Sequence, residues 1–150
     1  AQVQDLRSAV SREACRALFA LAVACGPGLE PVSLALLPVL LKVALVAIAV
    51  VGESASQCAR AMVQECPTPG MLALLLEQVA ARGGAHRWRC AQALLRALQV
   101  YPPDVLESRT GALEAAIATC LEDAREEVRA CGKRCFWAFR ARSEQRAEAL

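Results

Sequence analysis

The chain has 150 residues, of which 56% are hydrophobic and only 4% are aromatic. This apolar content exceeds that of disordered chains, and its richness in Ala and Leu favours packed helices over a β-sandwich or barrel. The net charge of +2 is too small to indicate a nucleic-acid-binding protein.

Helical periodicity and helix-breaking residues divide the chain into helices. Ala14, Leu18 and Leu21 fall on one face of a first helix over 8–25, and the Gly-Pro-Gly sequence at 26–28 ends it. Pro31 suits the first turn of the next helix. Further helices are expected over 48–65, 71–81, 86–99, 104–122 and 124–140, and a closing helix over 143–150 with Ser143 as its N-cap.

Three helices open with related sequences: AVSREACRAL (9–18), AHRWRCAQALL (85–95) and EEVRACGKRC (126–135). Each carries an early arginine, Arg12, Arg87 or Arg129, and their spacing is a multiple of about 40 residues, which is typical of HEAT and armadillo repeats. We therefore predict an all-α solenoid of HEAT-like antiparallel helical hairpins. The three arginines are expected to brace neighbouring repeats through hydrogen bonds.

The repeats are expected over 1–25, 31–65, 69–99 and 104–141, followed by the start of a closing helix, so that 1–150 is one partial domain. A single hairpin cannot bury its apolar stripe alone. The helix over 8–25 has no partner before it in the sequence, so we expect an exposed apolar face there, or a contact between copies of the chain.

The eight cysteines include no CxxC pair, and His86 is the one histidine. This spacing fits neither a zinc site nor a small disulfide scaffold. Free thiols serving as small core residues are the expected reading, which implies a reducing compartment. No metal and no cofactor are expected.

Catalysis finds little support, because no Ser or Asp completes a triad with His86 and no phosphate-binding loop occurs. The carboxylates at 122, 123, 126 and 127 suit a helix N-terminus. The apolar run over 43–52 is too short to span a bilayer, and charged residues interrupt the start of the chain where a signal peptide would lie. We expect neither an enzyme nor a membrane protein.

In a HEAT solenoid the turns within repeats line up along one edge. Here these turns are expected at 5–8, 42–50, 81–85 and 121–125. Arg7 and Arg82 lie in two of them, and His86 follows the second. A basic edge suits an acidic protein partner. The alternative for Arg7 and Arg82 is a purely solvated charge.

Four stretches resemble, in order and spacing, the second half of a TOG domain of the CLASP family: DLRSAVSREACRAL (5–18), LLPVLLKV (36–43), ARGGAHRWRCAQALL (81–95) and 106–150. The last stretch is the most specific. It contains an Asp-Ala-Arg turn at 123–125, where the family has Asp-Ala-Asp. The aromatic Phe-Trp-Ala-Phe run follows at 136–139, and Arg-Ala-Glu-Ala-Leu closes the chain at 146–150.

The resemblance implies a cytoplasmic, microtubule-associated module that binds αβ-tubulin through its intra-repeat turns. Arg7 and Ser8 match the family's Arg-Ser turn, and Arg82 matches the Lys of its Ser-Lys-Ser turn. The first two repeats of the family domain, with their tubulin-contacting aromatic, are not matched by this sequence.

One departure concerns the fourth-repeat turn, where the family has Ser-Ala-Lys and this chain has Ala47, Ile48 and Ala49. The lysine is absent and the turn is apolar. The alternative function is therefore a HEAT-type scaffold or protein-interaction module without tubulin affinity, including a ciliary protein with an array of TOG domains. A nucleic-acid-binding helical repeat would need more basic residues.

Overall fold

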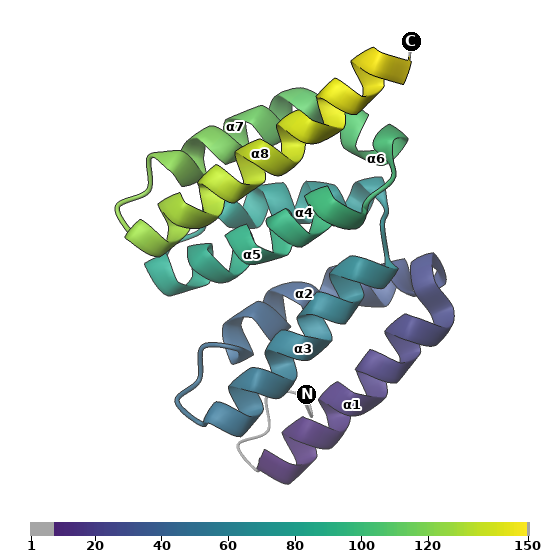
Figure 1. Cartoon of the computed structure of the whole chain (residues 1–150). Coiled ribbons are helices and arrows are strands. Elements are labelled where there is room, and N and C mark those ends of the chain that lie inside the picture. Colours follow the sequence, from purple (N-terminus) through teal and green to yellow (C-terminus); the bar gives the residue numbers. More distant parts are fainter. Residues whose placement is uncertain (1–7, 150) are drawn as a thin grey trace. The chain divides into compact units, whose positions relative to one another are not determined.

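The computed structural model describes residues 8–149, and in this range the chain forms helices and no strands. It folds into two compact units, one ending at Met71 and the other starting at Leu72. Each unit consists of helices joined by short turns that reverse the chain direction (Figure 1). The fold class is thus the predicted one, with HEAT-like antiparallel hairpins.

The first unit contains α1 (Ser8–Cys25), a 3-10 turn η2 (Gly26–Leu29), α2 (Glu30–Val43) and α3 (Ala49–Glu65). Both α1 and α2 pack against α3. The core of the unit is made of small and aliphatic side chains, such as Cys15, Leu37 and Ala55, none more than 2% exposed. These small residues allow the helices to approach closely.

Local chemistry explains where these helices end. Gly26 has a φ of +50°, a left-handed conformation that glycine adopts without strain and that commonly ends a helix. Pro31 lies in the first turn of α2, as predicted. Thr68 precedes α4 (Pro69–Val79). Its hydroxyl accepts a hydrogen bond from the Met71 N–H and donates one to Glu30 Oε1, at 3.2 and 2.6 Å.

The second unit contains most of α4, followed by α5 (Gly84–Val100), α6 (Pro103–Glu107), α7 (Thr110–Leu121) and α8 (Glu126–Ala149). Helix α8 packs against both α5 and α7, while α4 and α7 line a common groove. Two successive hairpins, α4–α5 and α7–α8, therefore stack on each other, as repeats in a solenoid do.

Two predicted boundaries were wrong. The helix expected over 104–122 is interrupted at Ser108 and Arg109, where the Ser108 hydroxyl donates to the Val105 carbonyl at 2.6 Å and so favours a turn. The separate closing helix over 143–150 is also absent, because α8 continues through Ser143 to Ala149. This segment has no Pro or Gly and is rich in the strong helix formers Ala, Glu and Arg.

The stretch Ala9–Val43 is long and apolar enough to cross a membrane by length and composition, with a mean hydropathy of 1.6 in its most apolar window. It overlaps the apolar run over 43–52 only at Val43. In the structure the longer stretch is not one rod, because η2 breaks it into α1 and α2. Only 17% of the window is buried.

The exposed apolar face predicted for the first helix is present. Phe19, Leu21 and Val23 of α1 are each about half exposed. Seven of the eight cysteines are buried and only Cys25 is exposed, which confirms the prediction that the thiols serve mainly as core residues. Burial raises the pKa of the Cys58 and Cys90 thiols to about 12, so both remain protonated.

Candidate protein-binding edge at the intra-repeat turns

The turn between α4 and α5 presents one arginine to solvent. Arg82 is exposed and stands between Ala81 and Gly83. Gly83 has a φ of +96°, which L-residues rarely adopt, and nothing lies within 4 Å of where its Cβ would be. Backbone conformation, and not crowding, is therefore the reason for glycine at this position.

The turn between α7 and α8 is organised by a carboxylate. Arg87, near the start of α5, donates from Nε to Asp123 Oδ2 at 2.5 Å and from Nη2 to Oδ1 at 3.1 Å. The Asp123 side chain is only 5% exposed, so this bidentate pair is largely shielded from water. Hydrogen bonding to Arg87 lowers the pKa of Asp123 and raises that of Arg87.

Two further arginines are attached to this turn. The backbone N–H of Arg125 donates to Asp123 Oδ1 at 2.9 Å, and Arg129 Nη1 donates to the carbonyls of Asp123 and Ala124, both at 2.8 Å. The Arg125 side chain pairs with Glu127, with Nη2 and Oε1 3.0 Å apart. Asp123 therefore holds the backbone of the α7–α8 turn and, through Arg87, also binds the start of α5.

The two turns of the second unit lie against each other. A Cβ added at Gly84 would collide with the Arg125 side chain, which shows that Arg125 crosses directly over the start of α5. The α4–α5 turn and the α7–α8 turn lie at the same end of the unit (Figure 1). We call the group formed by Arg82, Asp123 and Arg125 the turn edge.

The predicted site residues fall in different places. Arg7 lies outside the described residues, and Ser8 opens α1 with a side chain that the structure does not describe. Arg82 is exposed on the turn edge. His86 is only 7% exposed, and its Nε2 lies 3.2 Å from Gln78 Oε1 of α4, so it connects two helices and offers little surface to a partner.

Sequence reasoning did not select Arg125 as a site residue. Its position in the sequence could have indicated it, because Arg125 lies in the second intra-repeat turn of the second unit as Arg82 lies in the first. The bracing role predicted for the repeated arginines is confirmed for Arg87, which reaches the next repeat. Arg129 bonds instead to its own turn, and Arg12 is exposed.

The third described turn has a different character. Between α2 and α3 the chain turns at 44–48, where Leu45, Val46 and Ile48 are 40–46% exposed, and Val50 at the start of α3 is 49% exposed. Four exposed aliphatic side chains without an intervening charge form an apolar corner. This is the turn that the sequence, with Ala47, Ile48 and Ala49, predicts to be apolar and without a lysine.

Comparison with known proteins decides the family. A profile described as CLASP N terminal matches residues 1–150. The chain belongs to the CLASP N-terminal family. A CLIP-associated protein of Arabidopsis thaliana is 30% identical over 141 residues, covering 92% of the chain. CLIP-associating protein 1 of Xenopus tropicalis is 26% identical over 147 residues, covering 98% of the chain.

These CLASP relatives are much longer proteins, because the match covers only 10% of each. An uncharacterized protein of Dictyostelium discoideum is also 28% identical over 151 residues, 97% of the chain and 18% of that protein. Among solved structures, an engineered protein aligns with a TM-score of 0.53 at 17% identity, over 94% of the chain and 60% of its own length. At that identity the likeness supports the arrangement of helices alone.

Proposed function

We propose that the chain is a non-catalytic microtubule-binding module that presents its intra-repeat turns to αβ-tubulin. Membership of the CLASP N-terminal family supports this proposal. So does the turn edge, where the exposed Arg82 and the partly exposed Arg125 lie on neighbouring turns. As a cytoskeletal protein it would act in the cytoplasm, on microtubules.

The mechanism is positional. Because the Arg87–Asp123 pair and the Arg125 N–H bond hold the α7–α8 turn, the backbone that carries Arg125 is already ordered before it meets an acidic surface. Complementary charge mainly accelerates encounter and sets the register of docking. Arg7 and Ser8 of the first turn are proposed as additional contacts, and His86 is left out of the contact set because it is buried.

Co-sedimentation with microtubules and gel filtration with soluble αβ-tubulin test this function. The double variant Arg7→Glu, Arg82→Glu should bind about tenfold more weakly, because two contacts become repulsive. A matched control, Arg60→Glu with Arg109→Glu, makes the same charge change at exposed positions away from the intra-repeat turns. Equal binding by both double variants would mean that the edge is wrongly assigned.

A second function is favoured by the apolar α2–α3 turn. Leu45, Val46 and Ile48 present no charge to tubulin, and such a corner suits a HEAT-type scaffold that contacts another protein. If the wild-type chain elutes separately from soluble tubulin and does not sediment with microtubules, this scaffold function replaces the first. A contact between copies of the chain through α1 belongs to the same alternative, and sedimentation equilibrium would detect it.

A further inference from the structure

Arg12 of α1 stands at the same repeat position as Arg87 of α5. Three arginines share one register: each directly follows a buried residue and precedes a small residue by three positions. The corresponding segments are Ser11-Arg12 with Cys15, His86-Arg87 with Cys90, and Val128-Arg129 with Gly132. In α3 the same register places Gly52 after Val51.

The acceptor for Arg87 comes from the next repeat. Within its own repeat, Asp123 lies six residues before Arg129, which occupies the shared arginine position. By the same relation, the acceptor for Arg12 would lie six positions before Gly52, which is Val46. Val46 is 43% exposed and has no polar group on its side chain, so this position of the described first unit offers Arg12 no carboxylate like the one that Arg87 has.

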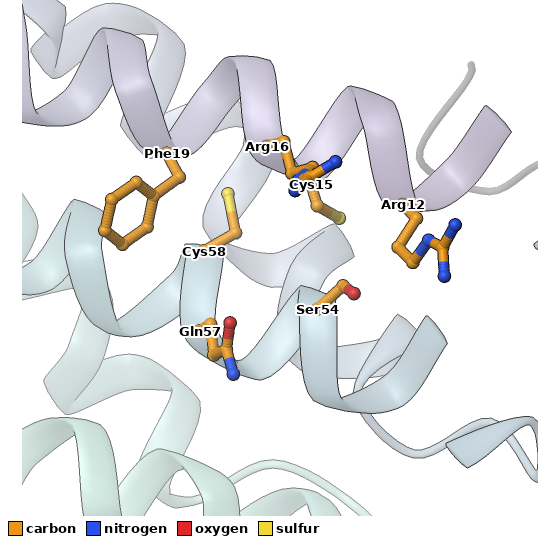
Figure 2. Close-up of a pocket in the computed structure, with 7 residues that line it drawn as sticks. All are labelled: Arg12, Cys15, Arg16, Phe19, Ser54, Gln57 and Cys58. Carbon is orange, nitrogen blue, oxygen red and sulfur yellow. The ribbon is translucent and has the colours of Figure 1, made fainter. Parts of the chain in front are cut away.

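Arg12 instead borders a groove. Figure 2 shows Arg12, Arg16 and Phe19 along α1, opposite Gln57 and Ser54 of α3. The groove has a volume of about 540 Å³. Arg12, Arg16 and Phe19 are all exposed, and the Arg16–Glu13 ion pair is long, at 3.6 Å, with both side chains at least three-quarters exposed. Such a pair contributes little and releases Arg16 readily.

We propose that this groove binds an acidic segment of another protein, whose carboxylate takes the place beside Arg12 and Arg16 that Asp123 takes beside Arg87. An apolar side chain of the same segment packs against Phe19. Arg12 and Phe19 are seven residues apart on α1, which is about 10 Å along the helix. The segment therefore carries its acidic and apolar residues about 10 Å apart.

Charge selects this class of ligand over a polyanion. Glu13 is paired with Arg16, and Glu53 accepts a hydrogen bond from Gln57 at 2.9 Å, so carboxylates stand on both helices that form the groove. A phosphate backbone needs a continuous basic track, and these carboxylates interrupt it. A peptide with one or two carboxylates does not need a continuous basic track, so it is compatible with these neighbouring carboxylates.

Peptide display on the full chain tests the proposal. A random peptide library is selected on the wild-type chain, after depletion on the variant Arg12→Glu, Arg16→Glu. Enriched peptides should carry an acidic and a large apolar residue, and should bind the double variant about tenfold more weakly. The control Lys42→Glu, Arg60→Glu changes the same charge at exposed positions of the same unit and should bind as the wild type does.

A second variant tests the repeat relation itself. Val46→Asp places a carboxylate at the repeat position that corresponds to Asp123, so it should pair with Arg12 and weaken peptide binding about threefold or more. Ile48→Asp adds the same charge two residues away and should have a smaller effect. If both aspartates weakened peptide binding equally, Arg12 would not be the residue that pairs with position 46, and the proposed repeat relation would be wrong.

Other outcomes would also overturn the proposal. Either no peptide is enriched over the depleted background, or the enriched peptides lack acidic residues. Single-stranded DNA that binds with the same dependence on Arg12 and Arg16 would make the groove a nucleic-acid site. A chain that dimerises, and becomes monomeric in the Arg12→Glu, Arg16→Glu variant, would make the occupant a second copy.

Discussion

Arg87 and Asp123 are 36 residues apart in the chain, yet the guanidinium of one donates two hydrogen bonds to the carboxylate of the other. The pair joins the start of α5 to the turn before α8. It therefore connects two successive hairpins of the second unit. The effect of removing it can be measured on the unfolding of that unit. Both tryptophans, Trp88 and Trp137, lie in this unit, so their fluorescence reports its unfolding.

Replacing Asp123 by Ala should lower the free energy of unfolding of the second unit by about 2 kcal/mol, because Arg87 and the Arg125 N–H lose a shielded acceptor. Urea unfolding followed by tryptophan fluorescence measures this. Glu122→Ala is the matched control, since Glu122 is an exposed neighbour and should change stability by less than about 0.5 kcal/mol. Similar losses for the two variants would contradict a special role for Asp123.

The same pair predicts a dependence on pH. Arg87 lowers the pKa of Asp123 below its ordinary value of 3.8, so the carboxylate stabilises the folded state at every pH above 3.8. The stabilisation is lost as the pH falls from that value through the lower pKa of the folded state. The stability difference between the wild type and Asp123→Asn should be constant from about pH 5 to 7 and shrink below pH 3.8. A difference that persists unchanged at the lowest pH would refute this.

Helices α7 and α8 approach each other at a glycine. A Cβ at Gly132 would lie 2.9 Å from Cys120 Cβ and 3.0 Å from backbone atoms of Cys120 and Leu121, which cannot move independently. Gly132→Ala should therefore destabilise the second unit by about 1–3 kcal/mol. Gly111→Ala in α7, where nothing lies within 4 Å, should instead stabilise it by about 0.5–1 kcal/mol. Paired urea curves would show the opposite signs.

Thiol reactivity should single out one cysteine. Cys25 is exposed, whereas burial raises the pKa of the Cys58 and Cys90 thiols to about 12, which leaves almost no thiolate at neutral pH. Mass spectrometry after brief alkylation of the native chain should find Cys25 modified first, and Cys25→Ser should abolish the fast phase. A hydrogen bond with Cys135 lowers the pKa of Cys131, but Cys131 is only 6% exposed and should react slowly.

Local sequence signals were sufficient for most of the fold. The Gly-Pro-Gly at 26–28 and Pro31 place the end of α1 and the start of α2, because both act on the backbone within a few residues. The interruption at Ser108 was missed because serines inside helices also bond to carbonyls one turn back, so a serine at this position does not by itself predict a break. The continuation of α8 through Ser143 was missed because an N-cap residue is also tolerated within a helix.

The candidate site was less predictable for a different reason. The repeat register indicated that Arg87 braces the next repeat, but it did not identify Asp123 as the acceptor, since that pairing joins residues 36 apart. His86 follows the turn in sequence, and only its burial and its contact with Gln78 of α4 show that its ring lies inside. The role of Arg125 depends on its contact with Gly84, which no local pattern encodes.

The bond from the Arg125 N–H to Asp123 has a consequence for how variants of this chain are interpreted. The carboxylate is almost inaccessible to any partner, yet it sets the backbone from which Arg125 extends. A substitution at Asp123 should therefore reduce affinity for a partner that Asp123 never touches. In a mutational scan scored by binding alone, position 123 would look like an interface residue, although its effect originates from the interior. Correcting each score for the fraction of folded protein would remove the part that comes from lost stability, and the part that comes from a displaced Arg125 would remain.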